Sequence, residues 1–312
     1  MSTTTPDSRG GRIAIATCRE AWRADEDAPL LLGALGDLGL DATEQVWDDG
    51  EVDWAGFDLV VIRSTWDYAL RRDEFLAWAD HVGSVTDLRN PASLVRWNTD
   101  KRYLADLAAD GVPVTDTTFL LPGDGTRPAE RIAEAIPPSS EFVVKPTVSA
   151  GSKDTVRYAS PDADGNAVGA AAAQATALLE AGRPVMVQPY LSAVDSDGET
   201  GLVFLGGSFS HAFRKGALLS VGGGAVTALY AEEAISPREP TQEQLAVAER
   251  VLDAARARTG VRELYARVDL LPGDDGRPVL LELELTEPSF FLATSDGAAR
   301  RAALAIASTL SG

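Results

Sequence analysis

Apolar and polar residues alternate in a pattern that predicts strands separated by amphipathic helices. Near the start of the chain, apolar runs favour strands at 12–17, 41–47 and 57–63. Apolar residues recur at helical spacing over 27–39 and 71–82. Strands that alternate with helices are typical of a parallel sheet covered by helices, so we expect a small α/β unit in this part of the chain.

A second pattern begins near Asn90 and continues to the end of the chain. Asn98 or Thr99 is expected to cap a helix that runs to Asp110, where Gly111 would stop it. The remaining predicted elements follow from the same helix and strand periodicities. Helices are expected up to Ala135 and at 168–181, 241–259 and 295–310, and strands at 112–121, 141–146, 184–191, 200–206, 208–214, 225–230, 263–271 and 278–285.

These patterns divide the chain into an expected tail and three units. The polar segment 1–11 lacks the apolar core of a signal peptide and is expected to be a disordered tail. An N-terminal α/β unit is predicted for 12–97, a central unit for 98–190 and a C-terminal unit for 191–312. A chain of 312 residues is long enough for two or three sub-domains with ample core.

Composition argues against several classes of function. The formal net charge of −19 argues against binding to nucleic acid or to an anionic membrane. No apolar stretch approaches the roughly 18 residues that a membrane-spanning helix needs. The single cysteine, Cys18, excludes an internal disulfide and fits a reducing compartment, and two histidines are too few for a His-rich zinc site. We expect a cytoplasmic protein, and a homo-oligomer is compatible with its sequence.

The chain has only four lysines against 24 arginines, at Lys101, Lys145, Lys153 and Lys215. An ammonium group is a compact point charge and a guanidinium group is a planar fork, so the two are not interchangeable at a phosphate. The retention of lysine at these four positions therefore indicates phosphate binding. The alternative for Lys101 is an exposed lysine, and the alternative for Lys145 is a strand-end lysine that reaches to water.

A loop rich in small residues follows Lys145 directly. Ser149, Gly151 and Ser152 would let backbone N–H groups approach phosphate oxygens, and Lys153 lies in the same loop. The Walker pattern GxxxxGK[ST] is absent from the chain. We therefore expect the segment 147–155 to be a nucleotide lid of another kind.

Three acidic residues near the C-terminus form a candidate Mg²⁺ site. Glu282 and Glu284 alternate with leucines and so share one face of a predicted strand. Asp269 ends the preceding strand, and carboxylate oxygens are hard ligands that suit Mg²⁺. Arg267 would share the face of Asp269 and bind a transferring phosphoryl group. The alternative is an edge strand whose acids face solvent.

A polar cluster follows the third predicted strand. Functional residues of parallel sheets gather at the carboxyl ends of the strands, where Arg63, Ser64, Thr65 and Asp67 lie. We expect Arg63 to pair with a substrate carboxylate and Asp67 with an amino group, in a small polar pocket for a free amino acid. The alternative is that Arg63 and Asp67 pair with each other. Cys18, after the first strand, is expected to be a core residue rather than a nucleophile.

The order of these motifs resembles that of the ATP-grasp carboxylate–amine ligases. The resemblance covers about residues 98–295 and rests on Lys101, FVVKP with its loop, VMVQPYL, YARVD and LLELELTEP. It implies an α/β ATP-grasp fold with an N-terminal Rossmann-like parallel-sheet domain, a central lid subdomain and a C-terminal antiparallel-sheet subdomain. The segments RSTWDY, WNTDKRYLADL, KPTVSAGSKDT and ELELTEPSFF resemble the O-ureido-D-serine cyclo-ligases of D-cycloserine biosynthesis.

The resemblance implies ATP and Mg²⁺ as cofactors and assigns residues to ATP. Lys101 and Lys145 match the two nucleotide lysines, and 147–155 matches the mobile lid over the triphosphate. Asp195 or Glu199 matches the acid that binds the ribose. The hinge whose backbone reads adenine corresponds to Gln188, Pro189, Tyr190 and Leu191.

It also implies which groups hold the metal and act on the substrate. Arg267 matches the arginine that steadies an acyl-phosphate, and Arg214 and Lys215 are expected to face phosphate or substrate. Ser289 would line the small-substrate pocket. The metal ligands correspond to Asp269, Glu282 and Glu284, and the last of these is often Asn in the superfamily.

The implied reaction has two steps. A substrate carboxylate attacks the γ-phosphate of ATP to form an acyl-phosphate, and a nitrogen nucleophile then displaces phosphate. In the cyclo-ligases both groups belong to O-ureido-D-serine, and ring closure gives D-cycloserine. Two other functions stay open at this point: a ligase that joins an amino acid to a separate amine or amino acid, and a nucleotide-binding protein without turnover.

Overall fold

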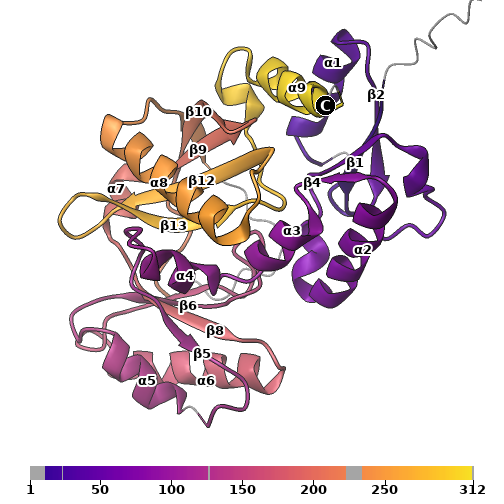
Figure 1. Ribbon diagram of the computed structural model, residues 1–312. Helices are drawn as coiled ribbons and strands as arrows, with labels where there is room; N and C mark the ends of the chain where they lie inside the picture. The colour runs from indigo at the N-terminus through magenta and orange to yellow at the C-terminus, as the bar shows by residue number, and fades with distance from the viewer. Residues whose placement is uncertain (1–10, 23, 126, 223–233, 311–312) are drawn as a thin grey trace, which may run out of the picture.

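The strands of the chain form three sheets with helices packed on them (Figure 1). The structure, a computed structural model, describes residues 11–22, 24–125, 127–222 and 234–310. Most of the expected tail and the strand expected at 225–230 lie outside the described residues. The mixed α/β architecture confirms the predicted fold class.

The N-terminal sheet is parallel, with strand order β2-β1-β3-β4. Leu59 and Val61 pack in one cluster with residues of α1, whereas Val60 and Ile62 pack in another with residues of α2. Helices thus cover both faces, which explains why β3 is apolar at every position. The elements are β1 (Arg12–Thr17), α1 (Asp27–Asp37), β2 (Asp41–Val46), η1 (Trp54–Gly56), β3 (Leu59–Ile62), η2 (Trp66–Leu70), α2 (Arg72–Val85) and β4 (Asp87–Arg89).

The helix expected from Asn98 or Thr99 to Asp110 begins later than predicted, as α4 (Tyr103–Ala109), and it ends before Asp110 and Gly111 as expected. A separate helix, α3 (Ala92–Asn98), precedes it, with Lys101 in the turn between them. The Asn98 side chain caps no helix, because it donates to the Leu283 carbonyl and accepts from the Leu285 N–H. These tertiary hydrogen bonds override the local capping signal that predicted a helix start at this position.

The central sheet is antiparallel, with strand order β5-β8-β6-β7 and its own apolar cluster. Ala171 and Ala175 of α6 pack in that cluster with Val144 and Val187 of the sheet. Small residues on the helix let it lie close to the strands. The elements are β5 (Thr118–Leu120), α5 (Pro128–Ala135), β6 (Phe142–Pro146), β7 (Val156–Tyr158), α6 (Ala167–Glu180) and β8 (Val185–Pro189).

The C-terminal sheet is antiparallel, with strand order β11-β10-β9-β12-β13. The helix α8 begins at a capping box made by Thr241 and Gln244 and packs on the sheet through Ala248 and Val251. The elements are α7 (Ala193–Asp197), β9 (Glu199–Leu205), β10 (Ser208–Lys215), β11 (Ile235–Pro237), α8 (Gln242–Thr259), β12 (Tyr265–Pro272), β13 (Pro278–Glu284), η3 (Leu292–Thr294) and α9 (Ala298–Thr309).

The last helix, α9, returns to the start of the chain and lies beside α1 (Figure 1). Its residues Ala302 and Ile306 share an apolar cluster with Leu31 and Leu35 of α1. Phe213 of the C-terminal sheet belongs to the same cluster. The N-terminal and C-terminal sheets are therefore joined by a shared core, whereas the predicted division into three units remains a prediction.

Side-chain groups from α3, α4 and nearby loops cover the edge of β13. The Leu283 carbonyl accepts a hydrogen bond from the Asn98 side chain, and the Leu283 N–H donates one to the Tyr103 hydroxyl. Asn98 also accepts from the Leu285 N–H, and Asn90 donates to the Leu285 carbonyl. The edge backbone groups at the end of β13 are therefore satisfied without another strand, which fixes the position of the acidic residues beside them.

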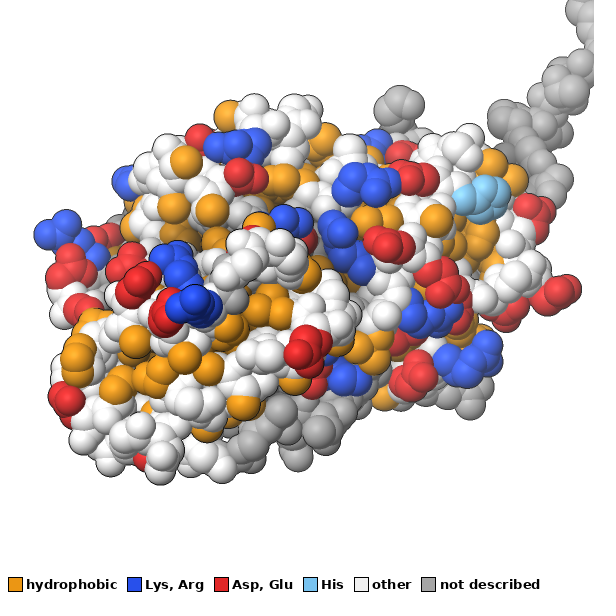
Figure 2. Space-filling view, turned by 90° about the horizontal axis from the view of Figure 1, so that it is seen from below, with side chains coloured by type: hydrophobic (Ala, Val, Ile, Leu, Met, Phe, Trp, Pro, Cys, Tyr) orange, Lys and Arg blue, Asp and Glu red, His pale blue; other side chains and the backbone are white. Residues whose placement is uncertain are grey.

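None of the described helices is long and apolar enough to cross a membrane. On the face drawn in Figure 2, acidic and basic side chains are intermingled. That face offers no broad basic surface of the kind that nucleic acid binds.

Candidate functional site

A cavity of about 700 Å³ is lined by residues of the central and C-terminal sheets and by loops of the N-terminal unit. Most of the predicted site residues lie in its wall, although they come from distant parts of the chain. These are Lys101, Lys145, Ser149, Gly151, Ser152, Gln188, Pro189, Tyr190, Leu191, Glu199, Lys215, Arg267, Glu282, Glu284 and Ser289. The remaining predicted residues are not part of the wall: Arg63, Ser64, Thr65, Asp67, Lys153, Asp195, Arg214 and Asp269.

The acidic residues lie on two paired strands. Asp269 of β12 stands opposite Glu282 of β13, and Arg267 stands opposite Glu284. The Arg267 guanidinium donates to Asp269 at 2.9 Å and to Glu284. On the neighbouring strand β9, Gly201 pairs with Asp269, and a Cβ there would lie 3.1 Å from the Asp269 carboxylate and 2.4 Å from the Phe213 ring. The lack of a side chain at Gly201 therefore makes room for Asp269.

Lys101 links the acidic strands to the loop of small residues. Its Nζ atom lies 3.0 Å from Glu282 and donates to the Ser149 carbonyl at 2.7 Å. Burial alone would raise the pKa of Glu282, but the positive charges of Lys101 and Lys145 outweigh it and lower the pKa to about 2. Lys145 is half-buried, and loss of solvation lowers its pKa even though Glu282 acts in the opposite direction.

Two other carboxyl groups in the wall hold their protons more tightly. Burial, together with the negative charges of Glu282 and Asp269, raises the pKa of Glu284 to about 8 in spite of Arg267. Burial also raises the pKa of Glu287 to about 7, although Lys101 and a hydrogen bond from Tyr68 oppose the shift. Glu284 and Glu287 therefore keep a proton more readily than Glu282 does.

This donor set fits a divalent metal ion. Asp269, Glu282 and Glu284 offer hard oxygen ligands from one face of two paired strands. Lys101 and Lys215 lie within 4 Å of two of these carboxyl groups and occupy positions from which phosphate oxygens can be reached. Carboxylates next to lysines are the arrangement needed to hold Mg²⁺ between a protein and a triphosphate.

The two candidates for the ribose acid have different surroundings. Both carboxylate oxygens of Asp195 accept from Arg157, and the Tyr190 hydroxyl donates to the same carboxylate at 2.6 Å. Asp195 lies outside the cavity wall, whereas Glu199 is part of it and lies 3.5 Å from Lys215. The geometry favours Glu199 over Asp195 as a nucleotide-facing acid.

The predicted hinge is fixed by hydrogen bonds to the central unit. The side-chain amide of Gln188 donates to the Thr117 hydroxyl at 2.9 Å, and the Tyr190 N–H donates to the Glu141 carbonyl at 2.8 Å. The Arg157 guanidinium stacks on the Tyr190 ring, with Cζ 3.5 Å from its centre. The segment Gln188–Leu191 is thus held rigidly at the end of β8, beside the cavity.

The segment 147–155 is anchored at its start and at its end. Lys101 donates its backbone N–H to the Thr147 carbonyl at 2.8 Å, and Val148 and Ala150 pack against an apolar cluster of the N-terminal unit. Arg183 pairs with Asp154 at 2.6 Å. Within the segment, Gly151, Ser152 and Asp154 have positive φ angles. Lys153 lies in this part of the loop, outside the cavity wall.

Arg63 has a structural environment, which corrects its expected contact with a substrate. Its side chain is 1% exposed and pairs with Asp27 at 3.1 Å rather than with Asp67. It also donates to the Pro288 carbonyl and lies 3.8 Å from the centre of the Phe290 ring. Arg63 therefore holds the loop after β13 in place and does not reach the cavity.

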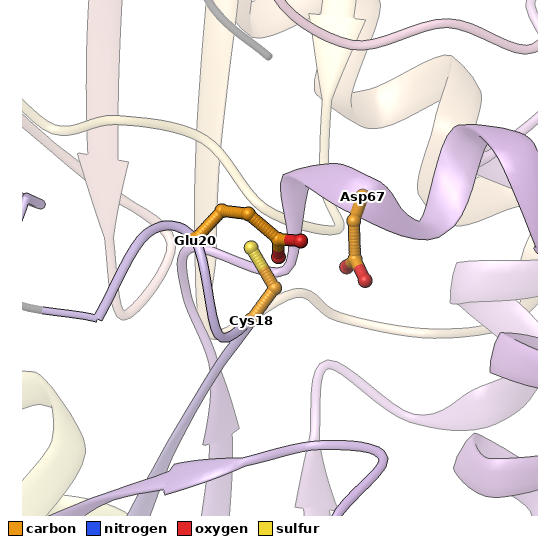
Figure 3. A group of neighbouring side chains, drawn as sticks. All are labelled: Cys18, Glu20 and Asp67. Atoms are coloured by element: carbon orange, nitrogen blue, oxygen red, sulfur yellow. The ribbon is translucent and has the colours of Figure 1, made fainter.

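Ser64, Thr65 and Asp67 also face the interior of the N-terminal unit. The Ser64 hydroxyl lies 2.8 Å from that of Thr17, and Thr65 is fully buried. Asp67 accepts from the Trp47 indole and lies beside Cys18 and Glu20, as Figure 3 shows. Burial raises the pKa of the Cys18 thiol to about 11, so the thiol keeps its proton at neutral pH, which does not suit a nucleophile.

The two basic residues at the end of β10 differ from each other. Arg214 donates to the carbonyls of Ser196 and Asp197 and so fixes the chain near α7. Lys215 faces the cavity and lies 3.7 Å from Asp269. The expectation of a phosphate or substrate contact therefore remains for Lys215 and is not supported by the position of Arg214.

Sequence analysis missed Glu287 and Asp27. Glu287 lies in the cavity wall and is hydrogen-bonded to Tyr68. The alternation of LELE assigned one face of a strand, and Glu287 follows the end of that strand, where the alternation no longer applies. Asp27 looked like a helix-start acid, but its carboxylate accepts from the N–H groups of Phe290, Phe291 and Leu292. No local signal in the sequence reveals these long-range contacts.

Comparison with known proteins agrees with this geometry. Residues 13–90 match the family model described as "D-cycloserine synthetase DcsG, N-terminal domain". The cycloserine biosynthesis protein DcsG of Streptomyces lavendulae is 43% identical over 304 residues, which cover 96% of this chain and 99% of that protein. A crystal structure of D-cycloserine synthetase DcsG is 42% identical and covers 96% of this chain and all of that one, with a TM-score of 0.88.

More distant structures share the fold alone. D-alanine–D-alanine ligase from Bacillus anthracis superimposes with a TM-score of 0.67 at 14% identity, over 97% of each chain. A RimK-domain ATP-grasp protein from Sphaerobacter thermophilus gives a TM-score of 0.65 at 18% identity, over 95% of this chain and 98% of that one. Because the chain is 43% identical to DcsG over nearly the whole length of both proteins, it belongs to the DcsG family of ATP-grasp ligases.

Proposed function

We propose that this ligase activates the carboxylate of O-ureido-D-serine with ATP and closes it to D-cycloserine. The carrying observation is one cavity wall in which Lys101, Lys145 and Arg267 stand beside Glu282 and Glu284 of β13, with Asp269 of β12 paired opposite Glu282. This arrangement is suited to phosphoryl transfer to a carboxylate. The identity of the substrate is supported by the similarity to a D-cycloserine synthetase.

In the first step, the substrate carboxylate attacks the γ-phosphate, ADP leaves and an acyl-phosphate forms. In the second step, the oxygen-bound nitrogen of the ureido group attacks the acyl carbon, phosphate leaves and the ring closes. Water then takes up the carbamoyl group, and the ring nitrogen receives a proton in its place. The protein contributes position and charge, because no covalent bond to a side chain is needed.

The residues in the wall divide this work by position. Lys101 and Lys145 bind phosphate oxygens, and Lys215 lies near enough to Asp269 to serve the same phosphates. Arg267 is placed to balance negative charge on the transferring group. Asp269, Glu282 and Glu284 hold Mg²⁺, which supplies charge neutralisation for the triphosphate. The adenosine is bound by the Gln188–Leu191 segment, with Glu199 on the ribose, and 147–155 covers the phosphates.

The same proposal places the enzyme in the cytoplasm, acting on a small amino acid and not on nucleic acid or a membrane. The single cysteine, Cys18, is buried and free, as suits a reducing compartment.

The test is turnover of O-ureido-D-serine with ATP and Mg²⁺, followed by release of ADP and by mass spectrometry of the product. One equivalent of D-cycloserine per ADP supports the proposal. A product that joins two molecules would show an intermolecular ligase, and the absence of ADP release with any amino acid would show a binding protein without turnover. Lys145→Ala should abolish ADP release, whereas Lys153→Ala, outside the cavity wall, should alter it less.

A further inference from the structure

Glu287 is a buried carboxylate of the cavity wall that forms no ion pair with the described lysines and arginines. Among the described residues in the wall, Glu282 pairs with Lys101 at 3.0 Å, Glu284 pairs with Arg267, and Glu199 lies 3.5 Å from Lys215. Glu287 is 8% exposed, and no described lysine or arginine lies within ion-pair distance of it. A buried carboxylate without a cationic partner is costly unless a ligand supplies the positive charge.

The carboxylate is held in a fixed position by a neutral donor. The Tyr68 hydroxyl donates to Glu287, and Tyr68 is itself 3% exposed and stacked on Phe75. Burial first, and the negative charge of Glu287 second, raise the pKa of Tyr68 well above its ordinary value, so the phenol keeps its proton. One phenol fills only part of the acceptor capacity of a carboxylate, which leaves room for a ligand N–H donor.

The backbone around Glu287 is fixed from the N-terminal unit. The Trp66 indole donates to the Glu287 carbonyl at 3.3 Å, and Arg63 donates to the carbonyl of the next residue, Pro288. Trp66 also lines the cavity. Glu287 therefore sits where η2 meets the loop after β13, with an aromatic side chain beside it that favours a small cation.

We propose that Glu287, held by Tyr68, binds the α-ammonium group of the amino-acid substrate. This inference rests on the proposed function, because an amino acid whose carboxylate lies at the phosphates carries one cationic group that still needs a partner. Lys101 and Glu282 are close enough to shift the pKa of Glu287, so the ammonium subsite lies next to the phosphate-transfer groups. A free amino acid fits both subsites, and a carboxylate without an amine fits only one.

The experiment compares two ligands that differ only in the amino group. The first is O-ureido-D-serine, and the second is its analogue with hydrogen in place of the α-amino group. Their dissociation constants are measured by calorimetry on protein loaded with a non-hydrolysable ATP analogue and Mg²⁺. We expect the wild-type protein to prefer the amine at least tenfold, because a charge-assisted hydrogen bond in a buried site is lost with the analogue.

Glu287→Gln should reduce this preference to less than about threefold, since the amide keeps the shape but not the charge. Glu287→Asp should restore part of the preference. The matched control is Glu26→Gln, which changes an exposed acid at the rim of the same cavity and should leave the preference unchanged. The affinity for the ATP analogue should stay within about twofold in all three variants.

Equal binding of the two ligands by the wild-type protein overturns the inference. It is also overturned if Glu287→Gln prefers O-ureido-D-serine over the analogue as strongly as the wild-type protein does. If that variant does not fold, Glu287→Ala takes its place as the neutral variant. ADP release is measured on the same preparations. Binding with the expected preference but without ADP release would refute the proposed function and leave the ammonium subsite standing, whereas ADP release with no preference for the amine would refute the subsite alone.

Discussion

At the scale of single residues, neighbouring acids of one strand have opposite properties because their partners differ. Glu282 and Glu284 share a face of β13, yet the pKa of Glu282 is lowered to about 2 and that of Glu284 is raised to about 8. Burial opposes ionisation at both positions. Lys101 and Lys145 act on Glu282, whereas Arg267 is shared between Glu284 and Asp269.

Neutral substitutions at these two acids should therefore abolish activity with different effects on stability. Glu282→Gln removes the carboxylate partner of the buried Lys101 and should lower the free energy of unfolding by about 1–3 kcal/mol. Glu284→Gln leaves Arg267 paired with Asp269 and should melt within a few degrees of the wild-type protein. Thermal melting without metal, together with Mg²⁺-dependent ADP release, measures both effects. Full activity of either variant would contradict the assignment of these acids to the metal.

His211 should make the protein sensitive to mild acid. Its Nε2 atom lies 2.7 Å from the Phe290 carbonyl and its Nδ1 atom 2.9 Å from the Ser210 hydroxyl, and burial lowers its pKa below the ordinary 6.5. The folded state thus binds this proton less readily than the unfolded state. The contribution of His211 is complete above pH 6.5 and is lost as the pH falls from 6.5 towards the folded-state pKa, with a limiting slope of about 1.4 kcal/mol per pH unit.

Urea unfolding at pH 8 and at pH 5.5 measures this loss. His211→Gln should reduce the difference in unfolding free energy between the two pH values. His81→Gln changes an exposed residue of α2 and is the matched control, which should behave like the wild-type protein. An identical pH dependence in all three proteins would mean that His211 does not titrate on unfolding.

At the scale of elements, the loop after β13 depends on a helix at the other end of the chain. Asp27, the first residue of α1, accepts hydrogen bonds from the N–H groups of Phe290, Phe291 and Leu292 at 2.6–2.9 Å. The loop carries Ser289 and follows Glu287, and both residues line the cavity. A change at Asp27 should therefore act on the substrate side of the cavity.

Asp27→Asn should raise the KM for the amino acid at least tenfold while the affinity for ATP stays within about threefold, because the loop loses one charged acceptor but the phosphate groups keep theirs. Hydrogen exchange at 290–292 should become faster. Asp37→Asn, an exposed change at the other end of α1, is the control. Unchanged exchange at 290–292 would show that Asp27 does not hold the loop.

In the segment 147–155, only the middle part is expected to close over a bound nucleotide. Thr147 and Ser149 are tied to Lys101 and Asp154 is tied to Arg183, so nucleotide should slow hydrogen exchange mainly at 150–153. Addition of a non-hydrolysable ATP analogue tests this expectation. Equal exchange with and without nucleotide would count against a lid.

The elements also show which features a sequence can reveal. The facing acids of β12 and β13 follow from strand alternation, because side chains alternate with a period of two whatever surrounds the strand. The helix expected to begin at Asn98 or Thr99 begins instead at Tyr103, because the Asn98 side chain bonds to the backbone of Leu283 and Leu285 and does not cap a helix. Arg63 looked like a ligand for an anion, but its partner Asp27 is 36 residues away along the chain. Local patterns therefore predicted the strands and acids, and missed the contacts between units.

At the scale of the whole molecule, the three sheets are not equally connected. Residues of the N-terminal and C-terminal sheets share one apolar cluster, to which α1 and α9 both contribute. The central unit has a cluster formed by its own residues. Met186 of β8 also packs in the cluster of the C-terminal sheet, together with Leu202 and Leu280. The buried residues of α6, in contrast, belong to the central cluster alone. Opening of α6 therefore breaks fewer contacts with other units than separation of the N-terminal and C-terminal sheets.

We expect two cooperative transitions without ligand. Amides of β1 and β12 should exchange with the same opening free energy, and amides of α6 with a lower one. Native-state hydrogen exchange in increasing urea measures these opening free energies. A nucleotide bound between the sheets should make the opening free energy of α6 more similar to that of β1 and β12. A single opening free energy for all three units without ligand would contradict this expectation.

The covered edge of β13 has a consequence for how the chain avoids aggregation. An uncovered edge strand is a template for pairing with another chain. Here the side chains of Asn90, Asn98 and Tyr103 occupy its backbone groups, so the folded protein offers no open edge at 283–285. The segment 90–103 precedes β13 in the chain and is synthesised first. The segment that covers the edge is therefore available as soon as the strand that carries Glu282 and Glu284 has been made.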